Sequence, residues 1–96
     1  WPGTTPAGLV GDDLVDSSDF FPTFAELAGA SLPAGNVIDG RSLAARFRGG
    51  KGQPREWVFN QLARMWWVRS DRWKLNQAGE FFDLSDAPFT EKLVRK

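Results

Sequence analysis

The spacing of apolar residues changes near residue 56, and this change divides the chain into two predicted parts. Before it, residues 17–30 repeat apolar side chains at three- and four-residue intervals, which predicts an amphipathic helix. After it, apolar and polar residues alternate, which is typical of strands whose side chains point to opposite faces. We therefore expect a loop and helical segment over residues 1–55 and an antiparallel sheet segment over residues 56–96, both within one domain.

The predicted helix has recognisable ends. Phe20, Phe24 and Leu27 lie on one side of it and form an apolar stripe. Asp19 is the expected N-cap. Gly29 is the expected end of the helix, because glycine readily adopts the left-handed conformation found there. A second, shorter helix is expected over residues 41–49.

The alternating part predicts four short strands joined by turns. Their spans are EWVFNQ (56–61), MWWVR (65–69), RWKLN (72–76) and EFFDL (80–84). Strands that follow one another through short connections predict an antiparallel meander. The expected fold class is therefore α+β, a four-stranded antiparallel sheet with one or two helices packed on one face.

The alternation also assigns side chains to faces of the sheet. The expected apolar face carries Trp66, Val68, Trp73, Leu75, Phe82 and Leu84. Trp67 points away from that face, together with Met65 and Arg69. Two interpretations of Trp67 stay open, because it either packs against a neighbouring segment or stacks on a ligand.

Composition and charge limit the kinds of chemistry that the chain can carry out. The chain has no cysteine and no histidine, which excludes disulfides and a cysteine nucleophile and removes the usual general base near neutral pH. Its net charge is zero, but residues 1–40 hold six acids and no Lys or Arg, whereas residues 41–76 hold nine bases and two acids. Either the basic region attracts anions or the two regions pair on folding, and composition alone does not decide between these alternatives.

Several short patterns lack the residues that their chemistry needs. The GGKG run at 49–52 has no Ser or Thr after the lysine, as a phosphate loop requires. The acids at 12–19 do not supply the roughly six oxygens of a hard-cation site, so no metal ligand is assigned. Alternation places Arg72 and Trp73 on opposite faces, which argues against a nucleic-acid platform. No apolar run reaches the roughly 18 residues of a membrane span, so we expect neither nucleic acid nor membrane as a partner.

The order of the motifs resembles the C-terminal part of the sulfatase family, whose fold is similar to that of alkaline phosphatases. The matching segments are Trp1-Pro2-Gly3, Asp19 to Thr23, Leu27-Ala28-Gly29, Asp39 to Leu43, Arg69 to Leu75 and Glu80 to Leu84. No motif is specific alone, but their order is. One departure lies at residues 86–91, where DAPFTE replaces the family's Asp-Pro-x-Glu and leaves the substrate open.

The resemblance implies an enzyme that hydrolyses sulfate esters with calcium and a formylglycine, which is made from Cys or Ser in a Cys/Ser-x-Pro-x-Arg motif. In this chain Ser31 and Pro33 are followed by Gly35 where that Arg belongs, so no catalytic residue or metal ligand is carried over. We expect an N-terminal catalytic domain to be the missing partner and the fragment alone to be inactive. The parent enzyme is expected to act on a sulfated small molecule or glycan.

The last expectation concerns the substrate pocket of that parent. Arg64, Trp66 and Trp67 are the candidates for its rim, because the loop before the second strand is a place where proteins vary their binding residues. Two alternatives stay open: the C-terminal part of a related phosphonate or phosphodiester hydrolase, and a stand-alone carbohydrate- or protein-binding module. The sequence leaves the substrate, the compartment and the oligomeric state open.

Overall fold

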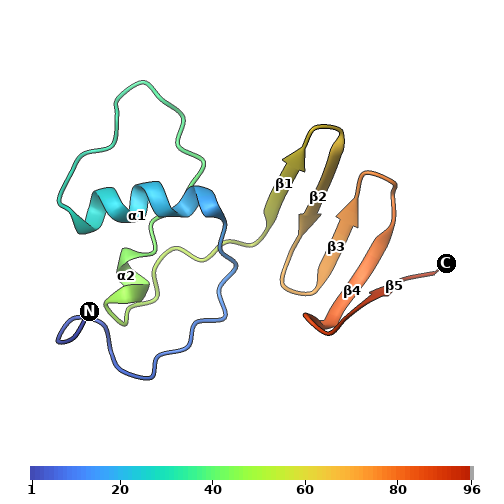
Figure 1. The fold of residues 1–96 in the computed structure, drawn as a ribbon, viewed down its shortest axis with the longest axis horizontal. Helices are drawn as coiled ribbons and strands as arrows, with labels where there is room; N and C mark the ends of the chain where they lie inside the picture. Colours follow the sequence, from blue (N-terminus) through green and yellow to red (C-terminus); the bar gives the residue numbers. More distant parts are fainter. Residues whose placement is uncertain (96) are drawn as a thin grey trace. The chain divides into compact units, whose positions relative to one another are not determined.

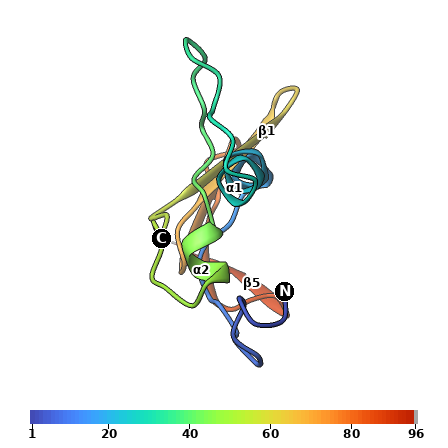
Figure 2. The same ribbon diagram turned by 90° about the vertical axis from the view of Figure 1, so that its left-hand side faces the viewer.

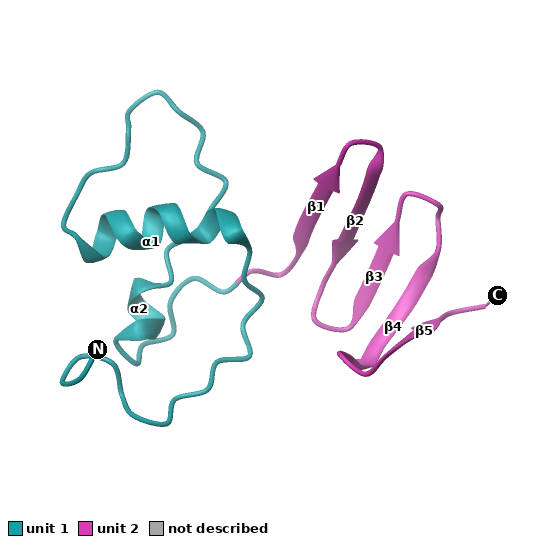
Figure 3. Ribbon diagram, in the orientation of Figure 1, with its two compact units in different colours: residues 1–54 teal, residues 55–96 magenta. Residues whose placement is uncertain are grey.

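The computed structural model describes residues 1–95, which form two compact units. The boundary falls between Pro54 and Arg55 (Figure 3). The first unit is built of helices and loops and the second of strands. The expectation of one domain in which a helix covers a face of the sheet stays a prediction.

The first unit contains two α-helices separated by a long loop. A 3-10 turn, η1 (Ser17–Asp19), leads into α1 (Phe20–Leu27), and α2 (Ala44–Phe47) follows (Figure 1). Between α1 and α2 the chain runs away from both helices and returns (Figure 2). Both predicted helices are present but shorter than expected. Gly29 (φ 68°) and Gly49 (φ 86°) follow them in the left-handed region, so the predicted role of Gly29 is confirmed.

Asp19 directly precedes α1, as predicted for its N-cap, but its side chain makes no capping hydrogen bond to that helix. Asp16, not Asp19, has an extended backbone (φ −118°, ψ 154°), and its side chain accepts a hydrogen bond from the Ser18 N–H. The Asp19 carboxylate accepts the Asp16 N–H at 2.9 Å, which completes a capping box. Asp19 therefore ends the first turn instead of preceding it, and only 1% of the residue is exposed.

Asp19 and Thr23 hold the loop that leads into α2. An oxygen of the Asp19 carboxylate accepts the Arg41 N–H at 2.7 Å, and Thr23 Oγ1 accepts the Leu43 N–H at 2.8 Å. The Thr23 hydroxyl in turn donates to the Asp19 carbonyl at 2.6 Å. Both acceptor side chains are buried, and these bonds satisfy backbone N–H groups of the loop.

Gly40 lets the same loop approach η1. A Cβ atom at this position would lie 1.9 Å from the Ser18 carbonyl oxygen, far inside the distance at which atoms repel. Glycine is therefore required here for lack of space. The two motif segments Asp19–Thr23 and Asp39–Leu43 are thus two sides of one contact.

The second unit is a five-stranded antiparallel sheet in which strands adjacent in sequence are adjacent in space (Figure 1). Its strands are β1 (Val58–Leu62), β2 (Met65–Arg69), β3 (Trp73–Asn76), β4 (Phe81–Asp86) and β5 (Thr90–Leu93). The first four correspond to the predicted strands, and the antiparallel meander is confirmed. The predicted number of strands was wrong. The fifth strand, β5, was not predicted because all four of its residues are exposed and its sequence lacks an alternating apolar signal.

Strand pairing builds a continuous apolar row on one face of the sheet. Phe59 pairs with Val68, Val68 with Leu75, and Leu75 with Phe81. Alternation along β2 and β3 places a tryptophan from each of these strands on the same face. We call the surface formed by these six residues the aromatic face: Phe59, Trp66, Val68, Trp73, Leu75 and Phe81.

Phe82 and Leu84 lie on the opposite face, contrary to the prediction. Phe82 pairs with Lys74, whose side chain points away from that of Trp73. The turn at residues 77–80 decides this, because a shift of one residue moves every side chain of a strand to the other face. We call the opposite surface the mixed face, and it includes Val58, Trp67, Arg69, Lys74, Phe82 and Leu84.

The aromatic face is not the better buried of the two faces. Val58 and Leu84, each 4% exposed, are the fully buried apolar residues among the described part of the sheet, and both lie on the mixed face. Phe59, Trp73 and Phe81 on the aromatic face keep 47%, 37% and 39% of their surface exposed. Trp73 was expected to be a core residue and is exposed instead.

Candidate functional site

The three predicted rim residues lie at one hairpin but do not lie on one face of the sheet. Arg64 is exposed in the two-residue turn between β1 and β2. Trp66 and Trp67 are half-buried neighbours in β2. Because successive strand residues alternate, Trp66 belongs to the aromatic face and Trp67 to the mixed face. Their assignment to a substrate pocket stays a prediction.

A hollow of about 410 Å³ lies beside the two tryptophans. Both of them line it, whereas Arg64 is not among its lining residues. Four residues with amide side chains are also among its lining residues: Asn60, Gln61, Asn76 and Gln77. Amides beside an aromatic ring are the groups that commonly recognise hydroxyl-rich ligands, so the lining is suited to a polar organic molecule.

Part of this polar lining already holds the fold together. The side-chain oxygen of Gln77 accepts the Trp66 N–H at 3.2 Å. The Asn76 side-chain oxygen accepts two N–H groups of the turn that follows β3, each at 3.0 Å. Met65 is 61% exposed at the same hollow, and Trp67 is half-buried there. The hollow therefore combines a structural amide network with exposed apolar surface.

Arg72 lies over the ring of Trp73, and the prediction that they occupy opposite faces was wrong. The guanidinium carbon is 4.7 Å from the ring centroid, and the nearest nitrogen is 3.0 Å from a carboxylate oxygen of Asp83. Arg72 precedes the first residue of β3, so strand alternation does not govern its direction. The expectation that nucleic acid is not a partner stays a prediction, without this argument for it.

The hydrogen bond from Arg72 lowers the pKa of Asp83 to about 2, and the Ser85 N–H, which donates to the same carboxylate at 2.9 Å, adds to the effect. The same hydrogen bond raises the pKa of Arg72. Both groups are therefore charged at neutral pH and neutralise each other. Lys74 is likewise paired with Glu91 at 2.6 Å.

Two further ion pairs bear on the uneven distribution of charge. Arg46 pairs with Asp13 at 2.5 Å, and Arg48 approaches Glu26 at 3.7 Å. Each pair joins a base of the basic region to an acid of the acidic region. Folding therefore neutralises part of the asymmetry, as one of the two alternatives predicted.

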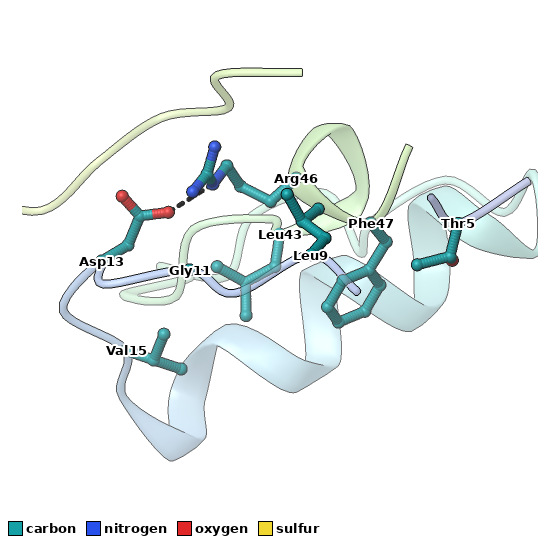
Figure 4. Close-up of a pocket in the computed structure, with 8 residues that line it drawn as sticks. All are labelled: Thr5, Leu9, Gly11, Asp13, Val15, Leu43, Arg46 and Phe47. Atoms are coloured by element: carbon teal, nitrogen blue, oxygen red, sulfur yellow. Dashed lines mark ion pairs between the residues drawn. The ribbon is translucent and has the colours of Figure 1, made fainter. Parts of the chain in front are cut away.

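A second hollow, of about 360 Å³, lies in the helical unit (Figure 4). The figure shows Leu43 and Phe47 facing it from the region of α2, with Leu9 from the N-terminal loop. The ion pair between Asp13 and Arg46 lies at its border. Sequence reasoning missed this hollow, because its loop residues have no regular spacing that a motif search could recognise.

No group of three or more acidic side chains among residues 1–95 is arranged to hold a metal ion. Asp13 pairs with Arg46, and Asp16 and Asp19 cap η1. The calcium implied by the resemblance therefore finds no fitting ligand set in the described residues. Within the same residues, no helix is long and apolar enough to cross a membrane.

Comparison with known proteins gives several similar sequences, although no family model matches the chain. Human arylsulfatase D is 32% identical over 80 residues, which are 82% of this chain and 13% of that protein. Human steryl-sulfatase is 45% identical over 49 residues, which are 51% of this chain and 8% of that protein. Canine N-acetylgalactosamine-6-sulfatase is 43% identical over 51 residues, or 53% of this chain and 10% of that protein.

A solved structure shows a similar arrangement of the backbone. The protein, described as a "putative sulfatase" from Bacteroides thetaiotaomicron, is 27% identical and superposes with a TM-score of 0.54. The match covers 73% of this chain and 18% of that one. The chain thus spans only a small share of the length of each relative.

Proposed function

Because the chain belongs to the sulfatase family, we propose that it is the C-terminal part of an enzyme that hydrolyses sulfate esters. The similarity to arylsulfatase D over most of the chain carries this proposal. The solved relative supports the fold. The match to a small share of each relative is consistent with a part of a larger hydrolase.

The role of this part is to complete the fold, and it has no catalytic activity alone. The contacts of the motif segments support this view. The Asp19 carboxylate and the Thr23 hydroxyl accept hydrogen bonds from the backbone N–H groups of Arg41 and Leu43 in the loop. A buried carboxylate whose oxygens accept backbone N–H groups is a structural element and is not positioned to attack a substrate. The formylglycine and calcium belong to residues outside this chain.

Arg64, Trp66 and Trp67 contribute to the rim of the substrate pocket. Arg64 is exposed at the hairpin turn, and a guanidinium forms strong paired hydrogen bonds with sulfate-like oxyanions. Trp67 borders the hollow beside exposed Met65, which suits the organic part of a sulfate ester. The residues bind and orient the ester, and the chemical step takes place elsewhere.

The proposal is tested on the natural polypeptide that carries these residues and on the 96-residue chain alone. The natural polypeptide should hydrolyse a chromogenic aryl sulfate, and the chain alone should not. Arg64→Ala should raise KM about tenfold with little change in kcat, because the residue contributes to binding and not to the chemical step. Arg64→Lys should retain part of the binding, because it keeps the charge without the planar fork.

The alternatives give different results in the same assay. A phosphonate or phosphodiester hydrolase would prefer a chromogenic phosphodiester over the sulfate ester. A stand-alone binding module would bind a glycan or protein without turnover. Turnover of the sulfate ester by the pure 96-residue chain would contradict the absence of catalytic residues from it.

A further inference from the structure

We propose that Gln61 and Ala63 are positioning residues for Arg64. They restrain the turn between β1 and β2, so that the Arg64 guanidinium is held in position to bind the oxyanion of the ester. Both residues act on the oxyanion through Arg64. This inference rests on the proposed function, because it takes a sulfate ester to be the ligand of that guanidinium.

The turn is tight, and its backbone is strained at Ala63. The pairing of β1 with β2 continues to Leu62 and Met65, so Ala63 and Arg64 form the whole connection (Figure 1). Ala63 has φ 53°, whereas every other left-handed residue among residues 1–95 is a glycine. A Cβ atom is disfavoured in this region, and two-residue turns usually place glycine or asparagine there. A strained residue persists only where its surroundings restrain it, and such residues are common at ligand-binding sites.

The side chain of Gln61 restrains this turn. Its Nε2 atom donates a hydrogen bond to the Ala63 carbonyl oxygen at 3.0 Å. That carbonyl belongs to the same planar peptide unit as the Arg64 N–H, so the bond fixes the plane from which Arg64 continues. Gln61 itself pairs with Trp66 in the ladder between β1 and β2. The turn is therefore tied to the sheet by a side chain as well as by the last strand pair.

Arg64 is exposed, and its guanidinium has no partner within the part of the chain that the structure describes. The other basic side chains of the five strands and their turns are engaged. Arg72, Lys74 and Lys92 are each paired with an acid. Arg69 donates hydrogen bonds to two carbonyl oxygens of the next turn. The Arg64 guanidinium thus keeps its charge and its donors for a ligand, and an oxyanion can accept paired hydrogen bonds from it.

A restrained turn lowers the entropic cost of binding the oxyanion. If the turn were mobile, binding would have to order both its backbone and the long Arg64 side chain, whereas a restrained turn leaves only the side chain to be ordered. Leu62 and Met65, on either side of the turn, line the hollow beside the two tryptophans. The turn therefore borders the hollow proposed to receive the organic part of the ester, and a restrained Arg64 favours esters whose oxyanion lies at that border.

The test measures KM and kcat for a chromogenic aryl sulfate in variants of the natural polypeptide. Ala63→Gly should raise KM about threefold with little change in kcat, because the turn gains freedom and Arg64 is less restrained. The same variant should raise the melting temperature, because the strain at this residue is removed. A structural role alone would not weaken substrate binding in a more stable protein. Ala78→Gly, at a turn residue whose own φ is not left-handed, is the control and should raise neither quantity.

Gln61→Ala tests the hydrogen bond to the turn independently of the strain at Ala63. It should also raise KM about threefold with little change in kcat. In a polypeptide that already carries Arg64→Ala, neither Ala63→Gly nor Gln61→Ala should raise KM further, because both act through the guanidinium that is then absent.

Inorganic sulfate gives a second readout that needs no turnover. An ion that binds the folded state raises the melting temperature, and the general effect of the salt is the same in every variant. The rise caused by sulfate should therefore be smaller in Ala63→Gly, Gln61→Ala and Arg64→Ala than in the unaltered polypeptide.

Two results would overturn the inference and leave the sulfatase assignment intact. One is an unchanged KM in both Ala63→Gly and Gln61→Ala while the aryl sulfate is hydrolysed. The other is a further rise of KM when either change is added to Arg64→Ala, which would show that the residue acts on the ester without Arg64. Absence of turnover, together with the expected contrast in the response to inorganic sulfate, would contradict only the proposed function.

Discussion

The helical unit and the sheet unit differ in the side chains that they bury. In the helical unit the largest buried side chains are polar, those of Asp19 and Thr23, whereas the sheet unit buries Val58 and Leu84. The paired strands of a sheet satisfy one another's backbone groups, so the side chains are left to pack. A unit made largely of loops leaves N–H groups that only side chains can satisfy. The helical unit therefore depends on a few specific bonds, and the sheet depends on apolar contact.

The largest expected effect comes from a substitution that disrupts the polar contact between η1 and the loop of the helical unit. Gly40→Ala places a Cβ atom 1.9 Å from the Ser18 carbonyl oxygen, so the loop must move away from η1. We expect a loss of about 4 kcal/mol in the free energy of unfolding, measured by urea titration. Gly11→Ala is the control, because its Cβ would meet only the end of the flexible Arg46 side chain at 3.3 Å. Equal losses would show that the loop tolerates the methyl group.

The corresponding change in the sheet removes apolar contact. Leu84→Ala should lower the free energy of unfolding by about 3 kcal/mol, because the residue is 4% exposed and the change leaves a cavity. Leu93→Ala in β5 should cost less than about 1 kcal/mol, because Leu93 is 45% exposed. Urea titration of both variants measures the difference, and a similar cost for the two would mean that burial at Leu84 contributes little.

A third change tests the hydroxyl that links α1 to the loop. Thr23→Val keeps the shape of the side chain but leaves the Leu43 N–H without the acceptor that it has at 2.8 Å. We expect a loss of about 2 kcal/mol in the free energy of unfolding. Thr23→Ser keeps the hydroxyl and should retain more than half of that stability. If valine were the better tolerated of the two, packing and not hydrogen bonding would hold the loop.

A fourth change should stabilise the sheet. Ala63, in the turn between β1 and β2, has φ 53°, where a Cβ atom is strained. Ala63→Gly removes that strain and should raise the urea midpoint by the equivalent of about 1 kcal/mol. Ala78→Gly is the control, because Ala78 lies in another turn without a left-handed backbone, and it should not stabilise.

The smallest expected effect is the response of the sheet to acid. The pKa of Asp83 is lowered to about 2 by Arg72, so the ionised carboxylate favours the folded state. This contribution is fully present above the ordinary pKa of 3.8 and is lost as the pH falls toward 2. Asp83→Asn should remove the part of the acid dependence that lies between these values. Urea midpoints measured across this pH range test the prediction, with Glu80→Gln as the control. The prediction would be contradicted if both variants kept the full dependence of stability on pH.

The sequence predicted those parts of the fold whose pattern lies within a single segment of the chain. The three- to four-residue period found α1, and the alternation found β1 to β4, because both patterns lie within one segment. The fifth strand was missed because its pairing with β4, and not an apolar pattern, makes it a strand. Arg72 was misplaced because the alternation was extended one residue beyond the strand.

The prediction of the pocket rim was also limited to features that lie within one segment of the chain. The sequence placed Arg64, Trp66 and Trp67 at one hairpin, and the structure places them there. The sequence also contained the information that Trp66 and Trp67 point to opposite faces. The hollow beside them could not be predicted, because it also depends on Asn76 and Gln77, which reach it through the pairing of β2 with β3.

By itself, the sequence determined the family, the order of the elements and which residues share a face within each strand. These depend on motif order and on local periodicity, which a linear chain carries directly. Only the tertiary structure decided that Phe81, and not Phe82, completes the aromatic face, and that Asp19 and Thr23 bind the loop at Arg41 and Leu43. The physical reason is that turn lengths and bonds between distant residues set which surfaces meet, and no local pattern records them.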